Sequence, residues 1–239
     1  MKNLLTIVFI FLMLLSFGGI VRSSLAGRQN MIVSNGGEPP LPEGVVAVEW
    51  LESDGNQNVT IGTIYGADIV SVMAEAEDIP SQGTRKLCGI GWNANGQDDV
   101  GITINGWNNS SSVPCIVGNW YEVVFDRNDT AYGSILVNLG RVGNCKSFFF
   151  DNGADKGKIF VLFCGSRGTG PYKSSSGNYM PWIGRIGRVR ISGGGETIRD
   201  LIPVRVGEGE EAEGFFYDLV SGEFFGNGGT GKLVFGNDL

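Results

Sequence analysis

Short runs of β-forming residues alternate with turn residues along almost the whole chain, and this alternation limits the folds that it can adopt. Examples are VVAVEWLE, VTIGTIY, WYEVVFD, KIFVLFCG and WIGRIGRVRIS, with segments rich in Gly, Asn, Asp and Ser between the runs. The chain has 39 Gly, and outside its N-terminal segment no helical periodicity extends beyond two turns. The pattern predicts an all-β fold, a two-sheet antiparallel sandwich.

The segment DIVSVMAEAE, residues 68–77, shows how such a strand would divide its side chains. Small apolar residues alternate with polar or larger ones, and successive side chains of a strand point to opposite faces. We therefore expect a buried face made of Val70, Val72, Ala74 and Ala76, and an outer face that carries Met73, Glu75 and Glu77.

The first 26 residues have the features of an export signal. Lys2 precedes an apolar run from Leu4 to Val21, and Ser24 and Ala26 are small residues at the spacing of a cleavage site. The run is also close to the length that spans a bilayer, so an uncleaved membrane anchor stays open as an alternative. We expect a secreted or cell-surface protein with a signal peptide at residues 1–26, a flexible linker at 27–41 and one domain at 42–239.

Composition excludes several classes of function. The chain has 18 basic and 25 acidic residues, a net charge of −7; without residues 1–26, which hold Lys2 and Arg22 but no acid, 16 basic residues remain and the charge is −9. Nucleic acids and anionic membranes attract basic surfaces, so we expect neither as a partner, with membrane contact only through a retained N-terminal segment. The absence of His removes Ser-His-Asp and Cys-His catalysis and His-containing zinc sites.

The segment GNGGTGK, Gly226–Lys232, matches the start of a phosphate-binding loop, and its glycines also match the dinucleotide pattern G-x-G-x-x-G. Both motifs need a following helix whose N-terminus faces the phosphate. Here the pattern KLVFG is typical of a strand, and Leu233 stands where a phosphate loop has Ser or Thr. We therefore expect no nucleotide site but a terminal hairpin between EFFG and KLVFG, with glycines in its turn.

The two ends of the domain resemble those of a known family. LPEGVVAVEWLESDGNQNVTIG near the start, and IRDLIPVRV with GFFYDLVSGEFFGNGGTGKLVFG at the end, are similar to the concanavalin A-like, laminin-G-like domain of bacterial surface and phage proteins. In the middle, GNWYEVVFD, KIFVLFCGSRG and WIGRIGRVRIS match the family in pattern only. The resemblance implies a two-sheet jelly roll that binds carbohydrate or cell surfaces, and it supplies no catalytic residue.

The four cysteines, Cys88, Cys115, Cys145 and Cys164, form no C-x-x-C pair. In an exported chain an even number of cysteines suggests disulfides, and four allow three connectivities. The resemblance makes KLCGIGW and IFVLFCGSRG neighbouring strands, which implies a bridge between Cys88 and Cys164. Cys115 and Cys145 would then pair or remain free, and four buried thiols stay open as the alternative.

The same strand adjacency predicts a carbohydrate site. If the loops that leave these two strands emerge at one rim, an indole ring meets amide, carboxylate and guanidinium groups there, which suits stacking on a sugar and hydrogen bonding to its hydroxyls. The expected ligand-binding residues are Trp92, Asn93, Asn95, Asp98, Asp99, Ser166, Arg167 and Tyr172. Trp50 and Trp120 are expected in the core, and Trp107, beside an Asn-rich turn, is open between packing and sugar stacking.

A glycoside hydrolase is the first alternative function. The enzymes of the resembled fold use two carboxylates on one strand, and Glu75 and Glu77 share a face. Pro80, however, stands where the family's pattern E-x-D-x-x-E has its last acid, so we interpret both residues as solvent-facing acids. We expect a non-enzymatic binding module for a glycan or a surface protein, and a purely structural surface protein is the second alternative.

Calcium is the one metal ion whose binding the sequence leaves open, and otherwise we expect no cofactor. Asp98 with Asp99, and Asp126 with Asn128 and Asp129, are oxygen-bearing groups at the ends of predicted strands. The segment DRNDT is equally typical of a turn, because Asn and Asp side chains accept hydrogen bonds from their own backbone.

Overall fold

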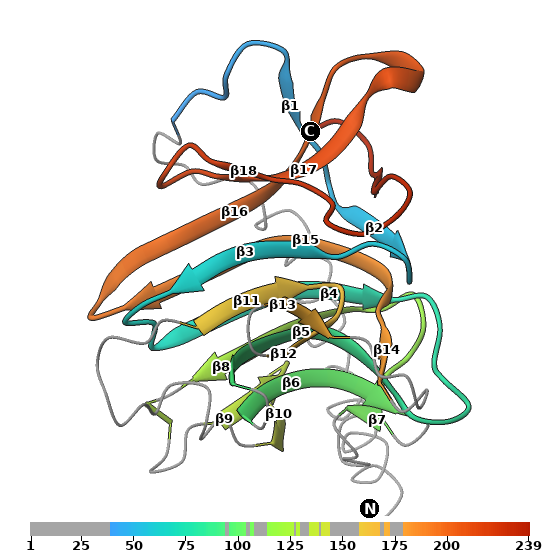
Figure 1. Ribbon diagram of the computed structural model, residues 1–239, viewed down its shortest axis with the longest axis vertical. Helices are drawn as coiled ribbons and strands as arrows, with labels where there is room; N and C mark the ends of the chain where they lie inside the picture. The colour runs from blue at the N-terminus through green and yellow to red at the C-terminus, as the bar shows by residue number, and fades with distance from the viewer. Residues whose placement is uncertain are drawn as a thin grey trace, which may run out of the picture. The chain divides into compact units, whose positions relative to one another are not determined.

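The computed structural model describes most of the chain after its first 38 residues, namely 39–93, 96–103, 106–107, 114–126, 128–129, 134–138, 140–143, 158–167, 170–172 and 179–239. Residues Leu41–Leu239 form one compact unit, and the expected signal peptide lies outside the described residues. Within the described ranges the chain is all-β, with one short 3-10 turn, η1 (Gly209–Glu211), and no α-helix (Figure 1). No helix in that part of the chain is long and apolar enough to cross a membrane.

The larger of two main sheets contains eleven strands, and all its pairs are antiparallel. Its main path runs β10-β9-β8-β4-β15-β16-β17-β18, while β1 pairs with β16 and β2 pairs with β15 and β19. The strands are β1 (Val45–Ala47), β2 (Leu51–Asp54), β4 (Ile69–Ala76), β8 (Trp120–Asp126), β9 (Ser134–Val137), β10 (Gly140–Gly143), β15 (Ile183–Gly193), β16 (Glu196–Val206), β17 (Glu213–Asp218), β18 (Phe224–Phe225) and β19 (Val234–Phe235).

The second sheet has six strands in the order β3-β11-β5-β6-β7, with β14 paired in parallel to β5. A separate hairpin, β12 with β13, contacts β5, β6 and β11. The strands are β3 (Val59–Ile64), β5 (Thr84–Asn93), β6 (Gly96–Thr103), β7 (Gly106–Trp107), β11 (Lys158–Leu162), β12 (Gly165–Arg167), β13 (Gly170–Tyr172) and β14 (Tyr179–Pro181). The predicted all-β fold with two sheets is therefore confirmed.

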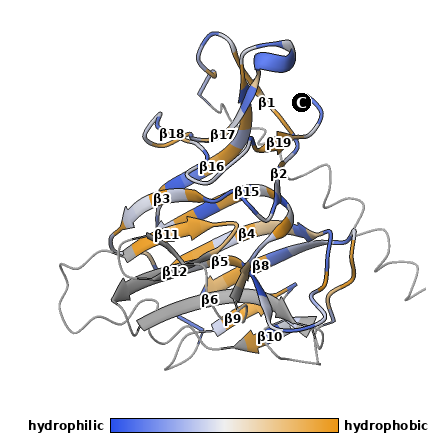
Figure 2. Cartoon of the chain, turned by 45° about the vertical axis from the view of Figure 1, so that its right-hand side comes forward, coloured by the Kyte–Doolittle hydropathy of each residue, from blue (hydrophilic) through white to orange (hydrophobic). Residues whose placement is uncertain are grey.

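Side chains from both sheets form one hydrophobic core, and hydrophobic residues concentrate on the strands that enclose it (Figure 2). Strand β4 follows the predicted alternation, because its four small apolar residues are fully buried in this core: Val70, Val72, Ala74 and Ala76. Strand β11 contributes Phe160 and Leu162, and β17 contributes Phe216. The side chains of β4 with the opposite parity lie on the outer face of the larger sheet, which carries the candidate site described below.

Strand β15 joins the two ends of the chain to the middle of the sheet. One edge of β15 pairs with β4, while the other pairs with β2 at Ile183–Ile186 and with β16 at Val189–Gly193. Two residues, Gly187 and Arg188, interrupt the register with β4 as a β-bulge. In Figure 1 the early strands β1 and β2 accordingly lie beside the late strands β16 and β17.

The predicted terminal hairpin is wrong, although both of its strands exist. Strand β18 pairs with β17 across the turn at Ser221-Gly222, but β19 pairs with β2 instead of β18. The intervening glycine loop binds the segment between β2 and β3, where the Gly228 N–H donates to the Asn58 carbonyl at 2.8 Å and the Thr230 N–H donates to the Asn56 carbonyl at 3.2 Å. The loop therefore spans from one strand pair to another, and strand β19 follows it where a nucleotide motif needs a helix.

Replacing Gly229 with Ala tests the role of this loop. A Cβ at residue 229 would lie 2.2 Å from the Asn56 carbonyl oxygen, so the backbone must shift, and we expect Gly229→Ala to lower the free energy of unfolding by about 1–3 kcal/mol. Gly228→Ala is the matched control, because its Cβ would meet a side-chain oxygen of Asn58 at 3.1 Å. Urea unfolding of both variants measures the difference, and equal stability would contradict the tight packing of the loop.

Candidate functional site

The outer face of the larger sheet carries a guanidinium surrounded by three carboxylates. Arg185 on β15 stands opposite Glu52 on β2 and opposite Glu75 on β4, because β15 pairs with both strands at this residue. Its Nε donates to Glu52 at 2.8 Å, its Nη1 to Glu75 at 3.1 Å, and its Nη2 lies 2.8 Å from Glu77, which directly follows β4. Strand register therefore brings together acids that are distant in sequence.

Backbone contact holds β15 close to β4 at this point. Gly184 precedes Arg185 and has a φ of 140°, and a Cβ there would lie 2.2 Å from the Glu75 carbonyl oxygen. Only Gly allows this approach without displacing the neighbouring strand. The position of Arg185 among the acids thus depends on the glycine before it.

Two tryptophans flank these charged groups. The guanidinium carbon of Arg185 lies 4.3 Å from the ring centroid of Trp50, a cation–π contact. Trp120 pairs with Glu75 across β8 and β4, and its ring lies next to Gly187. We call these six residues the Glu-Arg-Trp cluster: Trp50, Glu52, Glu75, Glu77, Trp120 and Arg185.

The expectation that Trp50 and Trp120 are core residues is wrong, because both are half-buried on the outer face. For Trp120 the signal was present in the alternation of β8. In WYEVVFD, Trp120 shares its parity with the exposed Glu122, while the buried Tyr121 and Val123 have the other parity. Trp107 instead is fully buried, with its ring centroid 5.4 Å from that of Tyr121, so packing is its role.

Glu75 and Glu77 share a face as predicted, but they are not simple solvent-facing acids. The Glu75 side chain is only 9% exposed and that of Glu77 33%, and both contact the same guanidinium. Burial raises the pKa of Glu77, the nearby Glu52 carboxylate raises it further, and Arg185 lowers it. One cation serves three acids, so the cluster has an excess of negative charge that favours a proton on Glu77.

The residues of the predicted rim lie on strands of the second sheet and on the separate hairpin β12-β13. Trp92 and Asn93 end β5, Asp98 and Asp99 lie in β6, Ser166 and Arg167 in β12 and Tyr172 in β13, while Asn95 lies outside the described residues. The neighbouring positions of β5 and β11 are confirmed, since Cys88 pairs with Leu162. The two strands are antiparallel, however, so the loops that leave them emerge at opposite ends, and the argument for a shared rim is wrong. Strand β12 does contact β5 and β6.

The cysteines that the structure describes are thiols. Cys88, Cys115 and Cys164 are buried and form no disulfide, so the implied bridge between Cys88 and Cys164 is absent, and Cys145 lies outside the described residues. The physical reason is the register: Leu162 stands opposite Cys88, and Cys164 follows Phe163, whose φ of 62° turns the chain away from the strand direction. A disulfide requires closer and better oriented Cα–Cβ bonds.

The expected calcium ligands after β8 form a turn. The Asn128 N–H donates to the Asp126 carboxylate at 2.8 Å, the local hydrogen bond that the turn interpretation predicts. Among the residues that the structure describes, no group of three or more acidic or sulfur-bearing side chains could hold a metal ion. The side chains of Asp98 and Asp99 are not among those described.

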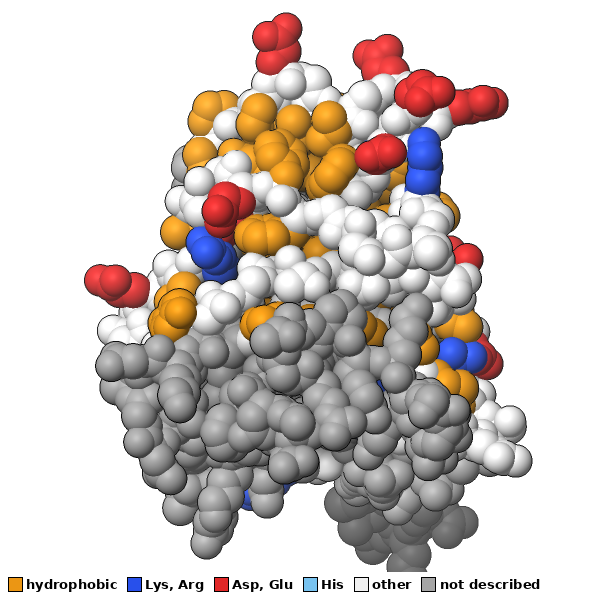
Figure 3. Space-filling model, viewed as in Figure 1, with side chains coloured by type: hydrophobic (Ala, Val, Ile, Leu, Met, Phe, Trp, Pro, Cys, Tyr) orange, Lys and Arg blue, Asp and Glu red, His pale blue; other side chains and the backbone are white. Residues whose placement is uncertain are grey.

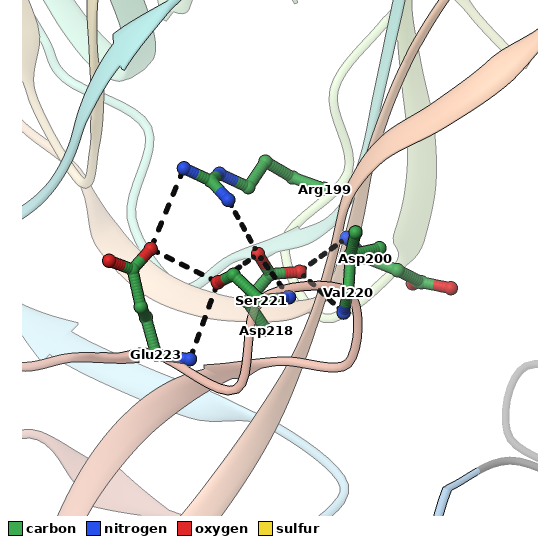
Figure 4. Close-up of polar contacts among 6 residues, drawn as sticks. All are labelled: Arg199, Asp200, Asp218, Val220, Ser221 and Glu223. Carbon is green, nitrogen blue, oxygen red and sulfur yellow. Dashed lines mark hydrogen bonds and ion pairs between the residues drawn. The ribbon is translucent and has the colours of Figure 1, made fainter.

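A second carboxylate network supports the turn between β17 and β18, and Figure 4 shows its members. The fully buried Asp218 accepts hydrogen bonds from the backbone N–H groups of Asp200 and Val220 at 2.9 and 3.1 Å, and from the Ser221 hydroxyl at 2.7 Å. Arg199 contacts Asp218 at 3.1 Å. Each carboxylate oxygen has partners within the fold, so this network is structural.

No protein-family model and no curated protein matches the chain.

The proton balance of the cluster predicts a pH dependence. Because the pKa of Glu77 is raised in the folded state, its carboxyl stabilises the fold fully below its unfolded pKa near 4.5, and this contribution is lost as the pH rises through the folded pKa. We expect the free energy of unfolding to contain a falling component above pH 4.5 that is missing in Glu77→Gln. Urea unfolding across this pH range tests it, with the exposed Glu196→Gln as control. Identical pH profiles of wild type and Glu77→Gln would refute the raised pKa.

Burial raises the pKa of Cys115 to about 11. Because the thiolate is the nucleophile, we expect Cys115 to resist alkylation in the native chain near pH 8 and to react once urea unfolds it. Mass spectrometry of iodoacetamide-treated peptides measures this. Rapid labelling of Cys115 under native conditions would contradict its buried, protonated state.

Proposed function

We propose that this chain is an exported, non-enzymatic binding module with a concanavalin A-like jelly-roll sandwich, and that it recognises carbohydrate at the cell surface or outside the cell. The observation that carries the proposal is the Glu-Arg-Trp cluster, where two half-buried indoles flank fixed polar groups on an open sheet face. The resemblance of the chain ends to that family and the two mainly antiparallel sheets support the jelly roll.

The chemistry of the cluster suits a sugar. An indole ring stacks on the C–H face of a pyranose, and carboxylate oxygens accept hydrogen bonds from its hydroxyls. Arg185 holds the three carboxylates in fixed positions, so little side-chain entropy is lost when a ligand binds. We favour the cluster over the predicted rim as the binding site, because the side-chain contacts of the cluster are defined by ion pairs and a cation–π contact.

A glycoside hydrolase is the second candidate, and the environment of the two acids favours it. The raised pKa of Glu77 suits a general acid, while the ion pair of Glu75 with Arg185 keeps a second carboxylate charged. Against this candidate, Pro80 stands where the pattern E-x-D-x-x-E of the enzymes has its last acid. A structural surface protein without a small ligand is the remaining alternative.

Glycan binding by the full chain and by two tryptophan variants tests the proposal. On a glycan array we expect selective binding, and we expect Trp120→Ala to weaken it by about 1–3 kcal/mol if the indole stacks on the sugar. Trp92→Ala is the matched control from the predicted rim and should bind normally. Loss of binding in Trp92→Ala alone would assign the site to the rim, and no binding to any glycan would refute the proposal.

Turnover distinguishes the two candidates on the glycan that binds. We expect no release of reducing sugars over long incubation. Release that stops in Glu77→Gln, while binding persists, would establish the hydrolase instead.

A further inference from the structure

A second surface, at strands β17 and β18, is aromatic and partly exposed, with the buried Tyr217 and the half-buried Phe215 beside the exposed Phe224. Phe224 is 42% exposed, and its ring centroid lies 4.8 Å from that of Tyr217 and 6.0 Å from that of Phe215. Val220, in the turn that joins the two strands, is 52% exposed. We call these four residues, Phe215, Tyr217, Val220 and Phe224, the aromatic surface. Burying such side chains against a partner releases water and is favourable, so an exposed group of this kind indicates an interaction site.

Acidic side chains surround this part of the molecule. Figure 3 shows hydrophobic side chains gathered near β17 and β18 with carboxylates at their margin. The segment GEGEEAEG leads into β17 and carries the exposed Glu208, Glu210, Glu211 and Glu213, and the exposed Glu223 directly precedes Phe224. Within the described residues no Lys or Arg side chain forms an ion pair with Glu210, Glu211 or Glu213, and Lys232 donates to the backbone carbonyl of Glu210.

We propose that the aromatic surface and its acidic margin bind a basic polypeptide segment of a partner protein, in which Lys or Arg residues alternate with aromatic or branched apolar residues. The apolar side chains of such a segment would cover Phe224 and Val220, while its cations would meet the unpaired carboxylates. Charge complementarity selects this partner, because long-range attraction speeds encounter and like charges penalise the wrong one.

The same charges disfavour other occupants. A second copy of this chain, with a net charge of −7, would bring two acidic margins together, and an anionic lipid surface would be repelled in the same way. A neutral glycan could donate hydrogen bonds to the carboxylates but would leave their charge uncompensated. This surface is therefore separate in chemistry from the Glu-Arg-Trp cluster, where Arg185 already neutralises part of the acid.

A defined peptide probe tests the proposal on the full chain. The probe is a fluorescent peptide of repeating Lys-Phe-Lys-Val units, and its control replaces every Lys with Glu. By fluorescence anisotropy we expect the Lys peptide to bind and the Glu peptide not to bind. Rising salt should weaken binding several-fold, because the acidic margin is exposed to solvent.

Two variants separate the apolar from the charged contribution. We expect Phe224→Ser, and the triple variant Glu210→Gln, Glu211→Gln and Glu213→Gln, each to weaken binding of the Lys peptide at least about tenfold. Tyr65→Ser is the matched control, because Tyr65 is 60% exposed but lies outside this surface. Circular dichroism confirms folding, and the triple variant keeps every apolar side chain if Phe224→Ser unfolds.

Three results would overturn the proposal. These are no binding of the Lys peptide, equal binding by wild type and the triple variant, or a concentration-dependent dimer in sedimentation that Phe224→Ser abolishes. The last would assign the surface to a second copy of the chain. Glycan binding by the Glu-Arg-Trp cluster is measured in a separate experiment. The peptide-binding proposal and the glycan-binding proposal can therefore be refuted independently of each other.

Discussion

The arrangement of the outer sheet face depends on the charge of Arg185. Strand β15 pairs with β2 and β4 at the same residue, and each neighbour presents a Glu there, with Glu77 just beyond. Without a cation between them, three carboxylates on adjacent strands would repel one another and the strands that carry them. An ion pair in a partly exposed site contributes little on its own, but removal of one shared partner leaves several charges uncompensated. The pairing of β2, β15 and β4 therefore requires a cation at residue 185 to compensate the carboxylates that the pairing brings together.

Arginine has the same role elsewhere in the larger sheet. Arg188 forms two contacts of 2.7 Å with Asp200, Arg199 contacts Asp218, and Arg205 contacts Asp238. The planar guanidinium suits these contacts, because it meets a carboxylate through two parallel N–H groups. Several acids of the sheet, Glu52, Glu75, Asp200 and Asp218, are thus matched to cations, and much of the excess negative charge lies in the segment that contains Glu208–Glu213. Paired acids fix structure, whereas unmatched acids remain available for electrostatic attraction.

The sequence predicts local structure well here, because alternation and glycine-rich turns act over a few residues. The strand at residues 69–76 and its buried face follow from the period of two. Partners distant in sequence are harder to predict. Strand β19 pairs with β2 because the glycine loop binds residues 56–58, and no local pattern in KLVFG indicates that choice.

The candidate site shows the same division between local and distant information. The shared face of Glu75 and Glu77 is readable from β4 alone, and the parity of Trp120 with Glu122 could have placed that indole outside the core. That Arg185 and Glu52 belong to the candidate site could not be predicted from the sequence, because their contact depends on which strands flank β15. The rim hypothesis used the adjacency of two strands without their direction, and antiparallel neighbours send their exits to opposite ends. The contact of β12 with β5 and β6, which no local pattern indicates, brings the strands of the rim residues together instead.

The pairing of both chain ends with β15 and β16 also constrains how this protein reaches its native state. Val48 forms a bridge with Asp238, and β1 pairs with β16, so the earliest strands find their partners only after nearly the whole chain has been made. Contacts of such large sequence separation slow folding, because a long loop must close before any of them contributes. During synthesis the N-terminal strands would have unpaired edges and exposed apolar faces until β15 and β16 are made. Exposed apolar surface and unpaired strand edges promote aggregation of a nascent chain until the later strands emerge.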